Sequence, residues 1–298
     1  MHHVKHISGL ALLATLAACS DKSVSAPPAP TVPLASTPAP ALTSEQIDET
    51  LMKAVFGAQY RPKTRDAVAQ LNSPYGETKI KFVLDAVAHS TLATGETVLL
   101  ARSRYASPTE AEYAGKMRWI GVYFLRHEKD KWVLIRRHDN LTMFEHDSKG
   151  SIAWIKLGKG KEGIAITSTS HWDKCSDEAV TLFDLGDPAL PRLNEPVATR
   201  SEASGTECNR FYDGSRWSGN GKWRMSPTAT GAPYDDLVMS FSGHIESPSS
   251  DDQGQTTGPL TTSSLEGSAR YAYDVKLKQY QLVEGKNPIP QVPEGDQG

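Results

Sequence analysis

A short polar stretch in the second half of the sequence carries the residue types that build a metal site or a reactive thiol. It reads SHWDKCSDEA and contains His171, Asp173, Cys175 and Asp177. Zinc takes tetrahedral sets of imidazole, thiolate and carboxylate ligands. His171, Cys175 and Cys208 could in principle supply such a set together with Asp173 or Asp177. The alternative role for the two cysteines is a disulfide, and the choice depends on the compartment in which the protein folds.

Motifs that would identify a reaction do not occur in this sequence. The nucleophile elbow G-x-S-x-G, the zinc-protease motif H-E-x-x-H and the P-loop are all missing. Paired acids occur at Asp235–Asp236 and Asp251–Asp252, whereas a glycosidase needs two carboxylates separated across a cleft. A solvated turn is the preferred interpretation of both pairs. No catalytic residue and no cofactor are predicted.

One glycine spacing matches a dinucleotide-binding turn and is interpreted as a hairpin instead. Gly158, Gly160 and Gly163 fit G-x-G-x-x-G, and Asp184 lies near the distance expected for a ribose-binding acid. In such a turn the third glycine opens a helix that faces the pyrophosphate. The residues that follow, IAITSTS, are rich in β-branched types, which favour a strand. A glycine-rich turn between two strands is therefore predicted.

The N-terminus has the pattern of an export signal. Lys5 and three histidines precede an apolar run over Ile7–Ala18, which is too short for a permanent membrane span and ends in small residues. Leu16-Ala17-Ala18-Cys19 resembles the lipobox of bacterial lipoproteins. The resemblance implies that residues 1–18 are a signal peptide that is removed. It also implies that Cys19 carries the lipid anchor, with palmitate as a fatty-acyl group, and becomes the first residue of the mature protein.

The same resemblance implies a destination and, through it, a role for the remaining cysteines. In that family an aspartate after the anchor cysteine is the usual signal for retention in the inner membrane. Ser20 stands at that place, so the outer membrane is expected, at its periplasmic face. Of the three cysteines, Cys175 and Cys208 then remain in an oxidising compartment, where a disulfide is expected. Such a bond would stabilise the fold by about 3 to 4 kcal/mol in the chain-entropy model.

Composition divides the rest of the chain into a tether, one domain and a tail. Residues 19–43 hold the anchor and a run rich in Pro, Ala and Ser, which is typical of an extended tether. Residues 44–288 contain no further proline-rich break, so we expect a single β-rich domain. Residues 289–298 are rich in Pro, Gly and polar types and are predicted to form a flexible tail.

The domain is predicted to begin with a short helix. Thr43 and Gln46 have the spacing of a capping box, and apolar residues recur at helical spacing over Ile47–Val55 before Gly57 ends the pattern. TRDAVAQL has helical spacing as well, which predicts a second helix somewhere in Lys63–Leu71.

Strand patterns dominate the remaining sequence. Short runs rich in β-branched and aromatic residues are separated by turn residues, and SGNGK before Trp223 is interpreted as one of these turns. Successive runs include ETVLLARSRY, MRWIGVYFLR, WVLIRRH, SIAWIKL, GIAITSTS, EAVTLFDL, DDLVMSFSG, ARYAYDV and QYQLVEG. We therefore expect a mainly β protein of antiparallel sheets, arranged as a sandwich, a barrel or a propeller-like sheet, with a short N-terminal helical segment.

Aromatic residues in polar surroundings are the remaining lead to a binding site. Stacked rings can form a surface that takes sugars or peptides, although core packing under loops explains the same residues. The candidates are Trp172, Tyr212, Trp217, Trp223 and Tyr234.

These observations favour a binding protein of the cell envelope. The formal net charge of −3 argues against a nucleic acid partner. The chain combines an anchor, a tether and a sheet without a catalytic motif, which predicts a non-enzymatic binding or accessory role, an inhibitor or immunity role included. The expected partners are the membrane, through the N-terminal lipid, and an envelope protein or polysaccharide. A hydrolase that acts on envelope polymer is the alternative.

The lipobox interpretation predicts the behaviour of one variant. Cys19→Ser removes the thiol that the lipid would modify, so the variant should lack the lipid and leave the membrane fraction. Labelling with radioactive palmitate and membrane fractionation measure both effects. Incorporation of label into the variant at the level of the unmodified chain would contradict the assignment.

Overall fold

The computed structural model describes residues 42–73, 76, 78–107, 117–145, 151–172, 175–203, 215–228, 231–250 and 256–290. All of these residues belong to one compact unit. The lipobox and Cys19, the predicted tether up to Ala41, Cys208 and Tyr212 lie outside them. Within the described part of the chain, no helix is both long enough and apolar enough to span a membrane.

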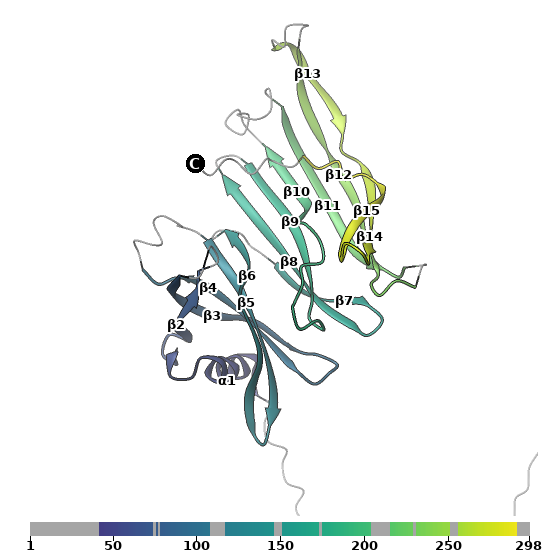
Figure 1. Ribbon diagram of the computed structural model, residues 1–298. Coiled ribbons are helices and arrows are strands. Elements are labelled where there is room, and N and C mark those ends of the chain that lie inside the picture. The colour runs from purple at the N-terminus through teal and green to yellow at the C-terminus, as the bar shows by residue number, and fades with distance from the viewer. Residues whose placement is uncertain are drawn as a thin grey trace, which may run out of the picture. The chain divides into compact units, whose positions relative to one another are not determined.

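The described residues form two antiparallel sheets and one α-helix, as the mainly β prediction requires (Figure 1). The first sheet has six strands in chain order: β1 (Tyr60–Arg61), β2 (Asp66–Asn72), β3 (Lys79–Thr91), β4 (Thr97–Tyr105), β5 (Met117–Glu128) and β6 (Lys131–Glu145). Each strand in this sheet pairs with the next one along the chain, so the sheet is a continuous meander.

The second sheet has nine strands and is also built mainly of neighbours in sequence. Its members are β7 (Ser151–Gly158), β8 (Lys161–Trp172), β9 (Cys175–Asp184), β10 (Val197–Ala203), β11 (Arg216–Ser226), β12 (Asp236–Ser250), β13 (Thr256–Ser264), β14 (Gly267–Asp274) and β15 (Gln279–Gly285). The order runs from β7 to β12 and then to β14 and β15, and β13 pairs with β12 beside this path. The strands β7 and β15 are therefore the two end strands.

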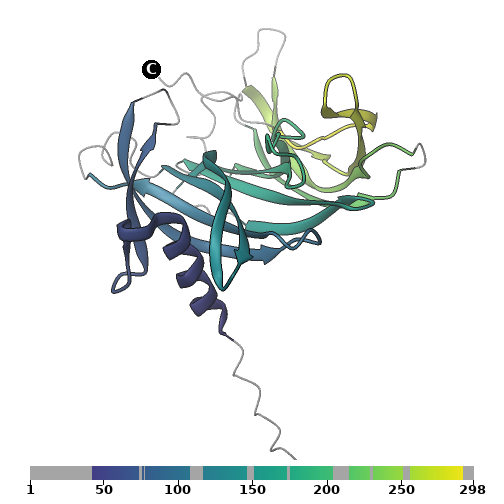
Figure 2. The same cartoon turned by 60° about the horizontal axis from the view of Figure 1, so that its bottom comes forward.

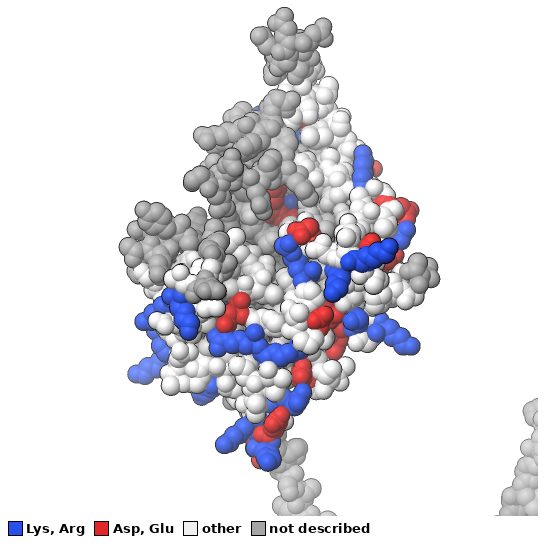
Figure 3. Space-filling view, viewed as in Figure 1, with Lys and Arg blue, Asp and Glu red and all other residues white. Residues whose placement is uncertain are grey.

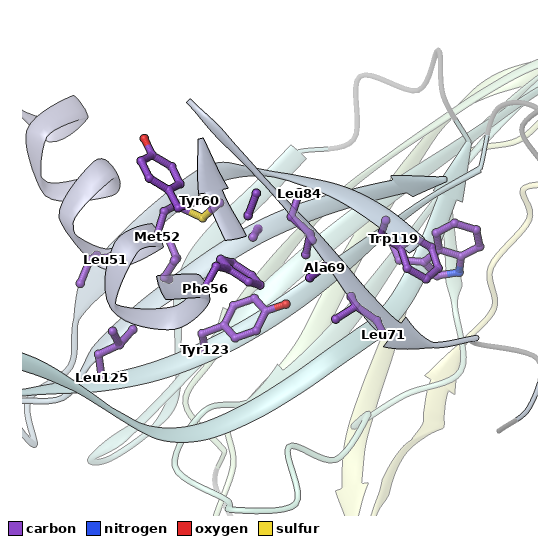
Figure 4. Close-up of a cluster of buried hydrophobic side chains, with 14 of the residues drawn as sticks. Leu51, Met52, Phe56, Tyr60, Ala69, Leu71, Leu84, Trp119, Tyr123 and Leu125 are labelled. Carbon is purple, nitrogen blue, oxygen red and sulfur yellow. The ribbon is translucent and has the colours of Figure 1, made fainter. Parts of the chain in front are cut away.

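The predicted N-terminal helix is present as α1 (Ser44–Phe56), followed by the short 3₁₀ helix η1 (Gly57–Gln59). Its capping box is complete, because the Gln46 backbone N–H donates to Thr43 Oγ1 and the Thr43 N–H donates to Gln46 Oε1. Figure 2 shows α1 beside the six-stranded sheet. In the core beneath it, the rings of Phe56 and Tyr123 lie 5.3 Å apart, edge to face (Figure 4).

The second predicted helix is wrong, because the residues after Arg65 form the strand β2. Ala67, Ala69 and Leu71 are all buried on one face, which is a period of two rather than 3.6. Pairing on both sides, with β1 and with β3, supplies the backbone hydrogen bonds that a helix would have made internally.

The turn predicted at SGNGK is also wrong, since these residues lie inside β11. The strand pairs without interruption with β12 from Arg216 to Ser226. Its glycines are closely packed: a Cβ on Gly219 would lie 3.3 Å from the Leu265 side chain, and one on Gly221 would lie 3.0 Å from the Phe241 ring. By contrast, the predicted glycine hairpin is confirmed, with Gly160 at φ +70° in the turn between β7 and β8.

The core is arranged in layers because the central strands are buried on both faces. In β5, Trp119, Tyr123 and Leu125 pack toward α1, whereas Ile120, Val122 and Phe124 pack against the second sheet. In β8 and β9, Ile164, Ile166 and Phe183 meet the first sheet, whereas Ala165 and Leu182 face a further core under β12 and β14. The stacking of two sheets corresponds to the sandwich among the expected arrangements.

The ordered chain extends further than the sequence predicts. Ile289 lies in the segment that was expected to be a flexible tail, yet its side chain is buried in the core under β12 and β14. The Asn287 side chain donates to Ala198 O at 2.9 Å and accepts from the Ile289 N–H at 3.0 Å, which holds this segment against β10.

The close packing at Gly221 predicts a stability difference between two glycine variants. Gly221→Ala places a Cβ 3.0 Å from the Phe241 ring and 3.3 Å from Thr199 O, so we expect a loss of about 1–3 kcal/mol in the free energy of unfolding. Gly267→Ala in β14 is the matched control, because its Cβ meets nothing nearer than Pro288 at 4.0 Å, and its effect should stay within about 0.5 kcal/mol. Urea denaturation measures the stability of both variants. Equal denaturation midpoints for Gly221→Ala and Gly267→Ala would show that the space at Gly221 does not restrict the side chain.

Candidate functional site

The polar stretch around Cys175 does not form a metal site in the described residues. His171 pairs with Ser176 and Cys175 pairs with Trp172 across β8 and β9, so the side chains of His171 and Cys175 point to opposite faces of the sheet. These two residues therefore cannot share a metal ion. Among the described residues, no group of three or more His, Cys, Asp or Glu side chains could hold one.

Cys175 lies in a small apolar cluster with Ala203, Trp217 and Leu265. It is 4 % exposed. Because Cys208 falls outside the described residues, its disulfide with Cys175 stays a prediction.

The predicted aromatic surface is not assembled in the described part of the chain. Trp217 is 3 % exposed, and its indole N–H donates to Ser201 Oγ at 2.7 Å inside the sheet. Tyr234 is 6 % exposed, and half-buried Trp223 packs against the core under β12 and β14. Burial therefore removes Trp217 and Tyr234 from the surface predicted for them. The Trp172 side chain and Tyr212 lie outside the described residues.

An open pocket lies instead along the end strand β15. Its volume is about 240 Å³. One wall comes from four successive residues of β15, Gln279 to Leu282, and the other from Asn194 to Val197, which lead into β10. Tyr271 of β14 and Asn287 complete the lining. Figure 1 shows β14 and β15 in yellow at the far end of the second sheet from β7.

A cluster of three tyrosines supports the floor of this pocket. The Tyr280 ring lies 5.8 Å from Tyr273 and 6.5 Å from Tyr234, and Tyr234 lies 4.3 Å from Tyr273. The Tyr280 hydroxyl donates to Asp235 O at 2.7 Å. Burial raises the pKa of Tyr280, and the nearby Asp235 raises it further. Tyr280 is therefore a protonated, fixed part of the floor at neutral pH.

A buried carboxylate holds the tyrosine cluster in place. Asp184, at the end of β9, is 1 % exposed and accepts from the Tyr234 hydroxyl at 2.6 Å and from the Gly186 N–H at 2.8 Å. Lys161 Nζ lies 3.2 Å from the same carboxylate and 4.7 Å from the Tyr234 ring centroid. Burial and the bond to Asp184 raise the pKa of Tyr234, so the phenol stays protonated and donates. Asp184 thus has a structural role rather than the nucleotide-binding role considered from its spacing.

The two asparagines of the lining fix the backbone around the pocket. Asn194 is buried, accepts from the Leu182 N–H at 2.7 Å and donates to Val180 O at 2.9 Å. Asn287 bonds to Ala198 O, as described above. Both side-chain amides are therefore occupied, and they shape the pocket rather than face a ligand.

The groups that face a ligand are the remaining amides and one tyrosine. Gln279 and Gln281 are half-buried and pair with β14 through their backbones, whereas their side-chain amides have no hydrogen-bond partner within the described structure. Tyr271 is half-buried, and its pKa is raised by burial and lowered in part by its bond to Asn287. Glu195 contributes a carboxylate, which is paired with Arg192 at 2.8 Å. The pocket therefore presents mainly neutral groups that can both donate and accept hydrogen bonds.

Sequence reasoning recognised QYQLVEG as a strand but not as part of a site. No residue of the lining belongs to a motif, and the two walls are separated by more than eighty positions in the chain. The only local signal is the placement of glutamines on either side of Tyr280 in a strand near the end of the domain. No family model, no curated protein and no solved structure matches the chain.

The carboxylate beneath the pocket predicts unequal effects for two tyrosine variants. Tyr234→Phe removes the donor to Asp184 Oδ2, and because the acceptor is a buried carboxylate we expect a loss of about 1–3 kcal/mol in the free energy of unfolding. Tyr273→Phe is the matched control in the same cluster, since no hydrogen bond of its hydroxyl occurs within the described residues, and it should change stability by less than about 0.5 kcal/mol. Guanidinium denaturation compares them; an equal loss in both would refute a special role for the Asp184 bond.

Proposed function

We propose that this protein is a lipid-anchored binding protein of the cell envelope, whose pocket along β15 holds part of an envelope component. Cys19 would anchor it at the periplasmic face of the outer membrane, and the proline-rich residues up to Thr43 would tether the β domain. The proposal is supported by the chemistry of the pocket lining. The side-chain amides of Gln279 and Gln281 are available for recognition, and the Tyr271 phenol, which bonds to Asn287, lies beside them in the lining.

The pocket favours binding over catalysis because it offers no base in position to act. Its one carboxylate, Glu195, is paired with Arg192, and burial raises the pKa of both lining tyrosines. General acid–base catalysis needs a group whose pKa lies near the working pH. A neutral lining of this kind suits a neutral polar ligand.

Charge on the surface gives no reason to expect a strongly charged partner. Figure 3 shows acidic and basic side chains close to one another across the viewed face. On the same strand as the pocket but outside its lining, Glu284 of β15 is paired with Arg270, which also contacts Asp236. Association driven by a field of one sign is therefore not expected at this site.

The alternative function, a hydrolase of envelope polymer, has no specific support from the described residues. Asp236, one of the paired acids, lies 3.1 Å from Arg270 and belongs to an ion pair. The backbone of Asp235 is held by Leu157 O and by the Tyr280 hydroxyl. Asp251 and Asp252 lie outside the described residues.

Site-specific cross-linking in a bacterial envelope tests the proposed binding site. The full-length chain is expressed in a Gram-negative host with the photo-reactive residue p-benzoylphenylalanine in place of Gln281, and irradiation should give a defined adduct. The matched control carries the same residue in place of Lys222, which is exposed on β11 and outside the pocket. Mass spectrometry then identifies the adduct as peptide or glycan. Identical adducts at both positions, or none at Gln281, would contradict the proposal.

A further inference from the structure

The pocket lies on the free edge of the second sheet. β15 is an end strand that pairs with β14 on one side only. An end strand presents a row of backbone N–H and C=O groups that another chain can use. The sheets have other end strands as well, namely β1 and β6 in the first sheet and β7 in the second. Of these four end strands, β15 is the one that contributes residues to the pocket lining.

The register shows which backbone groups face this edge. In an antiparallel pair, opposed residues alternate between pairs that exchange both hydrogen bonds and pairs that exchange none. The Tyr280 N–H donates to Leu193 O at 2.7 Å, away from β14, so the pair Tyr273–Tyr280 exchanges none. The next pair of the same kind is Tyr271–Leu282. The Leu282 N–H therefore points away from β14, out of the sheet edge, and Leu282 is also part of the pocket lining. Directly beyond this pair the register shifts, between Tyr271 and Arg270, so the regular ladder ends there.

At one end of the pocket, a backbone hydrogen bond within the chain already takes the place of strand pairing at the free edge of β15. The bond from Tyr280 to Leu193 O is the contact that an added strand would make at that position. Beyond it Asn194 to Val197 line the same pocket as Gln281 and Leu282. The edge is thus occupied at Tyr280 and borders the pocket at Leu282.

The side chains of this edge also suit an extended chain. Leu282 and Val283 are 48 % and 51 % exposed, and they follow directly on the polar Gln281. An extended peptide places alternate side chains on opposite faces, so it can set apolar groups against Leu282 while polar groups meet Gln279 and Gln281. A glycan would satisfy the amides but would leave the backbone pattern and the apolar residues unused.

We infer that the ligand of this pocket is an extended peptide segment of a partner protein, which adds to β15 as a further antiparallel or parallel strand through the Leu282 backbone. The inference rests on the proposed function, because it names the ligand class of the same pocket. Strand addition is a general mode of peptide recognition, in which main-chain hydrogen bonds provide affinity and side-chain pockets provide specificity.

Peptide selection on the full-length chain tests the inference. The chain is immobilised in detergent and panned with a phage library of linear twelve-residue peptides, and the selected peptides are synthesised for affinity measurement. Leu282→Pro removes the outward N–H together with the leucine side chain, at a position where an end strand tolerates proline, and should weaken binding about fivefold or more. Leu282→Val retains the N–H and is the matched control, with an affinity expected within about twofold of the unmodified chain.

Hydrogen exchange of the unmodified chain gives a second test, which does not depend on whether the Leu282→Pro variant folds. In the unmodified chain, a selected peptide should slow exchange of the β15 amides beyond Tyr280, because the Leu282 N–H gains an acceptor. Failure to select any peptide, or peptides that bind without slowing exchange in β15, would overturn strand addition. A glycan adduct at Gln281 combined with either failure would leave the binding site intact and reject only the peptide class. Failure of both experiments would reject the site as well.

Discussion

The packing of the two sheets against each other is the constraint on which the rest of the structure depends. Strands β5, β8 and β9 are buried on both faces. Because successive side chains of a strand point to opposite faces, a residue that packs on one face directs the next residue along the chain to the other face. The Arg136 side chain extends across this junction. Its guanidinium lies 3.6 Å from the Phe124 ring centroid and donates to Leu185 O and Asp187 O, just beyond β9. The first sheet therefore holds the end of β9 in position.

The pocket depends on this junction because two successive residues of β9 point to opposite faces of the sheet. Phe183 points into the core between the sheets, so the next residue, Asp184, points the other way and reaches Tyr234. Tyr234 and Tyr273 in turn contact Tyr280 in the pocket floor. A buried carboxylate is stable only where hydrogen bonds and a nearby cation compensate its lost hydration, and Tyr234, Gly186 and Lys161 provide them. The end strand β15 is thus held by a polar network and not only by its ladder with β14.

The proposed function joins these features to the N-terminal resemblance. A lipid anchor and an extended tether would restrict the domain to a layer near the membrane, where a weak contact gains from high effective concentration. The end strand β15 exposes Leu282 and Val283. An exposed apolar end strand can pair with other chains and so promotes aggregation. The position of β15 beside a pocket with two available amides would suit the proposed recognition of a partner chain.

The sequence by itself determined the mainly β class, the N-terminal helix and most of the strands. Capping at Thr43, the hairpin at Gly160 and the runs of β-branched residues are local features, because turn geometry and side-chain alternation act over a few residues. Local patterns misassigned β2 and the glycines of β11, since pairing partners and neighbouring side chains from distant segments decided both. Only the tertiary structure decided that Trp217 and Tyr234 are buried and that Asn194 to Val197 meets β15 to form a pocket. The reason is physical: burial and an unpaired sheet edge are properties of what lies beside a strand, and the strand's own residues do not specify its neighbours.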